Sequence, residues 1–170
     1  VLVVPKLLRY YLNDKPALAG ELTRILAYTL ERHLQTKVPG AMPGQVMFIQ
    51  RFGSDLNLHT HVHAVVSDGL FEEGRTLLGT PTLKFHQAPA PTDEETAKLA
   101  EDIRRKVLRR FVALNALPPD KADLMLSWRH SGFSLHAKTA IEAKDRQGLE
   151  NLLRYCARPG LRTKRLTYSR

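Results

Sequence analysis

Apolar residues recur every three or four positions in three stretches of the chain, which is the spacing that lines one face of a helix. The middle stretch opens with Thr92 and Glu95, a pair that forms a capping box at a helix start. A Pro-Gly or Pro-Pro pair follows each stretch, and such pairs end helices. The pattern predicts helices from Asp14 to residue 38, from Thr92 to residue 117 and from Asp145 to residue 158.

Short apolar or alternating runs between these helices predict β-strands over residues 2–4, 46–52, 58–67, 82–87 and 132–142. Pro43-Gly44 is typical of a turn, and Asp68-Gly69 is typical of a hairpin that leads into Leu70-Phe71-Glu72. The order is strand, helix, three strands, helix, strand and helix. It predicts an α+β fold with a largely antiparallel central sheet and helices packed on it, and we expect residues 1–170 to form a single domain.

Basic residues exceed acidic ones, 26 to 17, which gives a net charge of +9. Such a surplus indicates a polyanionic partner, most often a nucleic acid. The segment 154–170 carries no acid, and we interpret it as a phosphate-binding segment. Its basic residues are Arg154, Arg158, Arg162, Lys164, Arg165 and Arg170. The basic residues between 104 and 110 follow the acidic residues 93–95, which favours a solvated helix face instead.

The composition also excludes several classes of protein. Cys156 is the single cysteine, so the chain holds no intrachain disulfide and no multi-cysteine zinc site. No apolar run approaches the ~20 residues that span a bilayer, and no signal peptide is visible. We therefore expect a cytoplasmic protein with no membrane partner. The chain opens on Val1 rather than on methionine, so we expect a fragment of a longer protein.

The segment around residue 60 contains three alternating histidines, His59, His61 and His63. On a strand they lie on one face about 7 Å apart, while the residues between them form an apolar face. Two imidazoles at this spacing can share one divalent ion; the alternative is a polar strand whose histidines contact only water. A further ligand would be needed. The candidates for it are Gln50, Asn57, His59 and His136.

Tyr155 lies at the edge of the apolar face of the last predicted helix, which keeps its ring partly packed and its hydroxyl free. A tyrosine in this position is often only a packing residue. The neighbouring Arg154 and Arg158 make attack on a phosphodiester a second role. Because a phenol has a pKa near 10, that attack needs a metal to polarise the phosphate and cations to stabilise the phenolate.

Several blocks of the sequence resemble the rolling-circle transposases of bacterial insertion sequences, a class of HUH single-strand endonucleases. His61-Val62-His63 is similar to their His–hydrophobic–His motif. The other similar blocks are Gln50 to Leu58, Asp68 to Phe71, Gly132 to Ala137 and Leu152 to Pro159. The resemblance implies a catalytic domain from a longer transposase.

The resemblance also implies how the chain would act. His61 and His63 would hold Mg²⁺ or Mn²⁺, and Tyr155 would attack single-stranded DNA at transposon ends, leaving a 5′-phosphotyrosine link and a free 3′-hydroxyl. No small-molecule cofactor is implied, and the protein would associate with the bacterial nucleoid when bound to DNA.

This sequence departs from the family in two ways. Asn151 stands where many members carry a second tyrosine, which favours a single-tyrosine mechanism. The cysteine-rich, zinc-binding DNA-recognition region that members tend to carry at the N-terminus is absent from these residues. The alternatives are a truncated, non-catalytic DNA-binding remnant, a metal-binding structural domain unrelated to DNA, and a replication initiator or plasmid relaxase.

Overall fold

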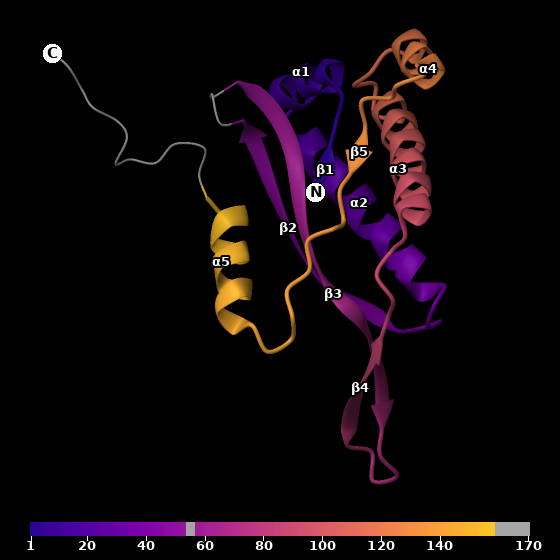
Figure 1. Cartoon of the computed structure of the whole chain (residues 1–170). Helices are drawn as coiled ribbons and strands as arrows, with labels where there is room; N and C mark the ends of the chain where they lie inside the picture. The colour runs from indigo at the N-terminus through magenta and orange to yellow at the C-terminus, as the bar shows by residue number, and fades with distance from the viewer. Residues whose placement is uncertain (54–56, 159–170) are drawn as a thin grey trace, which may run out of the picture.

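The computed structural model describes residues 1–53 and 57–158 and has an α+β fold, as predicted (Figure 1). Within the described residues one five-stranded antiparallel sheet has the order β2-β3-β1-β5, and β4 pairs with the far end of β3. The strands are β1 (Leu2–Val3), β2 (Met42–Phe52), β3 (Leu58–Arg75), β4 (Pro81–Gln87) and β5 (Ser134–Leu135). The helices are α1 (Lys6–Asp14), α2 (Ala17–Gln35), α3 (Asp93–Ala113), α4 (Pro119–Ser127) and α5 (Arg146–Cys156).

Strand β3 separates two chemically different faces of the sheet. Val62 is fully buried and pairs with Leu2 of β1, while His61 pairs with Val3. Since successive side chains of a strand point to opposite faces, Val62 faces the hydrophobic core and the histidines face away from it. Helices α1 to α4 supply most of the rest of this core. Its fully buried members include Leu8, Leu22, Leu26, Ile103, Val107, Leu108 and Phe111.

Helix α5 lies apart from this core, on the other side of β2 and β3 from α2 and α3 (Figure 1). Its start is capped as predicted, because Asp145 Oδ1 accepts a hydrogen bond of 2.8 Å from the Gly148 amide. The capping box of α3 is also confirmed. Thr92 Oγ1 accepts from the Glu95 amide at 3.1 Å, and Glu95 Oε2 accepts from the Thr92 amide at 2.9 Å.

Two helices in the structure were not predicted. Asp14 ends α1 instead of opening the next helix, and α1 directs Leu8 and Leu12 into the core. Helix α4 follows Pro118 directly, with Pro119 at its first position, where the missing amide hydrogen costs nothing. Helix α3 already ends at Ala113, before this pair, where Asn115 takes a positive φ of 52°. The proline pair therefore begins a helix but does not end the preceding one, contrary to the prediction.

Both turn predictions were wrong. Pro43-Gly44 lies inside β2, at a shift of the strand register that accommodates a residue without an amide hydrogen. Asp68-Gly69 lies inside β3, because Gly69 pairs with Gln87 and the Phe85 ring covers the position where a side chain would stand. The predicted strand 132–142 is reduced to β5, since its partner β1 has only two residues.

The far end of β3 and all of β4 form a two-stranded extension, residues 69–87, which we call the β3–β4 arm. Leu70 anchors its base in a small cluster with Ala41 and Ala88. Beyond this base the arm projects away from the helices and the rest of the sheet (Figure 1). Among the described residues, no helix has the length and apolar character needed to cross a membrane.

Candidate active site

Three histidine rings form a row on the face of β3 that points away from the core. The ring centroids of His59 and His61 are 5.2 Å apart, and those of His61 and His63 are 4.9 Å apart. Alternation along a strand places all three on the same side, as predicted. His59 and His61 are partly exposed, whereas His63 is buried, with only 7% of its surface exposed.

Hydrogen bonding fixes which nitrogen of His61 can act as a ligand or base. Its Nδ1 lies 2.6 Å from the carbonyl oxygen of His59. A carbonyl can only accept, so Nδ1 carries the hydrogen and, in the neutral ring, Nε2 keeps its lone pair. The neighbouring Nε2 of His63 is buried and has no hydrogen-bond partner within the described residues. A buried nitrogen without a partner is uncommon in folded proteins, and this one keeps its hydrogen-bonding or coordinating capacity for a further group.

The surroundings favour the neutral form of His59 and His63. Burial, and then the nearby His61, lower the pKa of His63 below its ordinary value. Burial, and then the charges of Arg9 and His61, lower the pKa of His59. Neutral imidazole is the form that coordinates metal ions, so the ring that is most buried is also held ready to coordinate one.

Tyr155 in α5 lies against the buried end of this row. Its ring centroid is 5.7 Å from that of His63, with the two rings at 84°. Tyr155 is nevertheless 53% exposed, so it is accessible from solvent. The Arg158 guanidinium carbon lies 5.8 Å from the centre of the tyrosine ring, close enough for a cation–π interaction.

A hydrogen bond from the sheet holds α5 in this position. Gln50 of β2, the cross-strand partner of His61, donates from Nε2 to the carbonyl oxygen of Cys156 at 3.0 Å. The Cys156 side chain is itself 3% exposed and seats the end of the helix. Residues that are 106 positions apart in the sequence thus meet beside the histidines.

The candidates for a third metal ligand are placed very differently. Gln50 neighbours His61, whereas the exposed Asn57 lies at the start of β3. The backbone amide of His136 donates to Val1, which puts His136 beyond β1 and two strands from the row. Within residues 1–53 and 57–158, no three histidine, cysteine, aspartate or glutamate side chains are arranged to hold a metal. Of the candidates outside the row itself, Gln50 is the one that lies directly beside His61 in the sheet.

The predicted basic residues are only partly described. Arg154 and Arg158 are exposed in and just after α5, whereas Arg162, Lys164 and Arg165 lie outside the described residues. The sequence reasoning missed Arg9, whose Nε donates to the Val4 carbonyl at 3.0 Å and whose charge acts on His59. The helical spacing of Leu8 and Leu12 was the signal that could have placed it.

Comparison with known proteins gives one match. No curated protein and no solved structure matches this chain. The sequence profile of a protein family described as "Putative transposase" matches residues 44–170. The matched segment contains the histidine row, Gln50 and Tyr155, and it covers well over half of the chain. The chain therefore belongs to this transposase family.

Proposed function

We propose that this chain is a transposase catalytic domain of the HUH type, which nicks and rejoins single-stranded DNA at transposon ends through Tyr155. One observation carries the proposal: a half-exposed tyrosine ring lies 5.7 Å from a buried histidine whose Nε2 has no partner among the described residues. A packing tyrosine needs no such neighbour. Because the chain belongs to a transposase family, DNA is the substrate that Tyr155 and His63 would be expected to act on.

In the nicking step the Tyr155 oxygen attacks the phosphorus of one phosphodiester. A bond forms between this oxygen and phosphorus, and the bond from phosphorus to the 3′-oxygen breaks. The phenol loses its proton, and the departing 3′-oxygen takes one up to become a hydroxyl. The strand stays attached to the protein as a 5′-phosphotyrosine. Attack by a 3′-hydroxyl reverses the step and rejoins DNA without an external energy source.

The arginines around Tyr155 have a defined part in this chemistry. Arg158 lies over the tyrosine ring, where its charge stabilises the phenolate that attacks. Arg154 is exposed one position before Tyr155 and can bind the phosphate backbone of the incoming strand. Both contacts are electrostatic, so DNA binding weakens as salt concentration rises.

The histidine row fits a divalent metal ion. His61 Nε2, His63 Nε2 and the amide oxygen of Gln50 would hold it, and a mixed nitrogen–oxygen set of this kind accepts Mn²⁺ and Mg²⁺. When bound, the ion would polarise the oxygens of the scissile phosphate. The backbone hydrogen bond of His61 would orient its ring toward the ion, as outer-shell partners do in metal sites.

The test is an SDS-resistant covalent adduct between the protein and single-stranded transposon-end DNA in the presence of Mn²⁺. We expect an adduct with the native chain and none with Tyr155→Phe, because phenylalanine has no nucleophilic oxygen. Tyr28→Phe is the matched control. Tyr28 is 54% exposed and has Lys106 Nζ 5.6 Å from its ring centre, but it lies on α2, among the helices of the other layer.

The outcomes separate the alternatives. An adduct that persists in Tyr155→Phe would exclude Tyr155 as the nucleophile. Adduct loss in both His61→Ala and His63→Ala, with DNA binding retained, would support the metal-binding role. Salt-dependent DNA binding by the native chain with no adduct at any metal concentration would instead identify a non-catalytic DNA-binding remnant.

A further inference from the structure

The two faces of the β3–β4 arm differ sharply in character. Strand pairing places Phe71 opposite Phe85, with ring centroids 5.1 Å apart, and Glu73 opposite Leu83. This face is therefore largely apolar. The opposite face is polar: Glu72 on that side binds His86 Nε2 at 2.6 Å. The arm is an amphipathic ribbon, and no helix or strand of the described part of the chain covers its apolar face beyond the base (Figure 1).

The apolar side chains of the arm are unusually open to solvent. Leu77 and Leu78 at the tip are 107% and 94% exposed, and Leu83 and Phe85 are 63% and 45% exposed. A two-stranded ribbon gains little stability alone, and a contiguous apolar patch on a projecting element is typical of an interaction surface. The arm is thus built to be covered by another molecule.

The charges of the arm indicate a protein partner rather than DNA. Two acidic residues, Glu72 and Glu73, balance two basic ones, Arg75 and Lys84. In a chain with a net charge of +9, this neutral segment lacks the cationic surplus that binds phosphates. Exposed leucines at the tip likewise suit a dry protein interface.

We propose that the arm packs against the arm of a second copy of this chain, apolar face to apolar face, about a two-fold axis. We place this axis at Gly74, midway between Glu73 and Arg75, running across the strands. Glu73 of each copy then lies opposite Arg75 of the other copy. The same axis brings Phe71 opposite the tip of the second copy's arm, where Leu77 and Leu78 are exposed. Across the ribbon, it brings Leu83 opposite Pro81 of the second copy. One operation thus matches charge to opposite charge and apolar to apolar, which is what an isologous interface requires.

The tip is rigid enough to form such an interface. The Thr76 amide donates to the Thr80 carbonyl at 2.9 Å, and Arg75 Nη1 donates to the Gly79 carbonyl at 3.1 Å. Arg75 is thereby oriented, and the other nitrogens of its guanidinium are available for a carboxylate. A preformed tip reduces the entropy that pairing of the arms would cost.

Sedimentation velocity of the full chain without DNA, over a range of concentrations, tests the pairing. We expect the native chain to dimerise and Glu73→Arg to raise the dimer dissociation constant by about tenfold or more, because like charges then face each other twice. Adding Arg75→Glu to Glu73→Arg should restore the affinity. Glu72→Arg is the matched control, with the same charge change one residue away on the other face.

A second pair of changes, Leu77→Ser with Leu78→Ser, tests the apolar contact without touching the charges and should also weaken the dimer. A native chain that stays monomeric would overturn the proposal. So would equal weakening by Glu72→Arg and Glu73→Arg, or failure of the charge swap to restore pairing. If Glu73→Arg tightened oligonucleotide binding by a monomer, the arm would be a DNA contact instead. The measurement needs no nicking activity, so its failure is distinct from failure of the Tyr155 test.

Discussion

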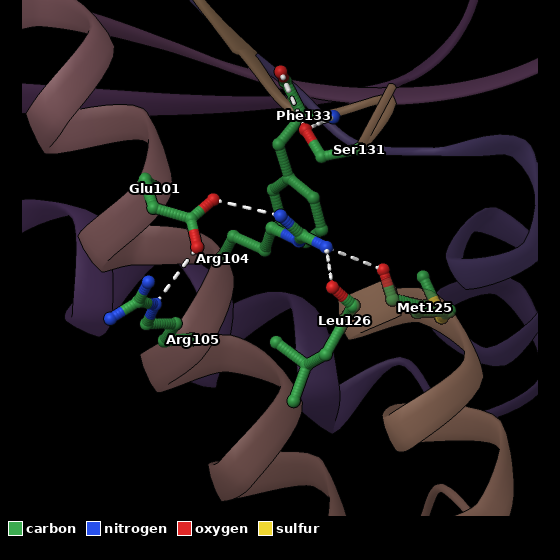
Figure 2. Close-up of polar contacts among 7 residues, drawn as sticks. All are labelled: Glu101, Arg104, Arg105, Met125, Leu126, Ser131 and Phe133. Carbon is green, nitrogen blue, oxygen red and sulfur yellow. Dashed lines mark hydrogen bonds and ion pairs between the residues drawn. The ribbon is translucent and has the colours of Figure 1, made fainter. Parts of the chain in front are cut away.

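Replacing Arg104 tests whether a buried guanidinium holds helix α4 and the chain after it in place. Arg104 is 7% exposed, and its Nη2 donates to the carbonyl oxygens of Met125 at 2.6 Å and Leu126 at 2.7 Å (Figure 2). Its Nη1 donates to Glu101 Oε2 at 2.8 Å. One side chain of α3 thus satisfies the carbonyls at the end of α4, which have no partner within their own helix.

The expected cost follows from what Arg104→Met leaves behind. Methionine keeps the apolar stem of the side chain but has no hydrogen-bond donors. The carbonyls of Met125 and Leu126 then lose their partner, and each loss lowers the free energy of unfolding by about 1 to 2 kcal/mol. Glu101 retains Arg105, whose Nε is 2.8 Å from its Oε1. We therefore expect Arg104→Met to lower the free energy of unfolding by about 3 kcal/mol. For a chain of this size, that loss lowers Tm by about 6 to 12 °C.

Urea unfolding followed by circular dichroism measures this loss, and Arg105→Met is its matched control. Arg105 binds the same glutamate from the same helix, but its side chain is 60% exposed. Arg105→Met should lower the free energy of unfolding by less than about 1 kcal/mol, because exposed ion pairs contribute little to stability. If Arg104→Met were no more destabilising than Arg105→Met, the carbonyl contacts would contribute nothing and the reasoning would be wrong.

Two further predictions concern Glu95 and Gln50. Hydrogen bonds from Lys37 and from the Thr92 amide lower the pKa of Glu95 from 4.5 to about 2, so its stabilisation is complete above pH 4.5 and is lost as pH falls toward 2. Tm recorded between pH 7 and pH 2 should fall less steeply for Glu95→Gln than for the native chain, and equal slopes would contradict the assignment. Gln50→Leu removes the 3.0 Å bond to the Cys156 carbonyl and should reduce adduct yield at least about tenfold while changing Tm little. A Gln50→Leu protein with unchanged adduct yield would show that this bond does not position α5.

Local patterns predicted the elements that depend on local chemistry. The capping box at Thr92 and the cap at Asp145 are short-range hydrogen bonds, so their residue types alone located two helix starts. The alternation of His59, His61 and His63 placed three rings on one face for the same reason. The prediction that the basic residues after Ile103 lie on a solvated helix face was wrong for Arg104. Its side chain is buried and donates to backbone carbonyls of α4.

Features set by distant parts of the chain could not be predicted in this way. Gly69 looked like a turn residue, yet a side chain there would collide with the backbone carbonyl of His86 and with the Phe85 ring across the ribbon, which is what requires a glycine. The contact between Tyr155 and His63 and the bond from Gln50 to the end of α5 join residues far apart in the sequence, and no spacing in the sequence reveals either of them. The shortness of β5 likewise reflects its two-residue partner and not its own composition.

Strand β3 is unusually long at 18 residues, and it carries the histidine row near one end and the arm at the other. Its pairing with β2 shifts between the pair Gln45–Val66 and the pair Pro43–Leu70, where a step of two residues on β2 matches a step of four on β3. Because the shift is even, odd-numbered positions on either side of it stay on one face of the sheet. Removing one residue between His63 and Phe71 would turn the apolar side of the arm to the opposite side of the sheet from the imidazoles. Removing two would shorten the strand by about 7 Å and keep both on the same side. As long as the register shift between Val66 and Leu70 keeps its size, length changes in this segment are compatible with both surfaces only in multiples of two.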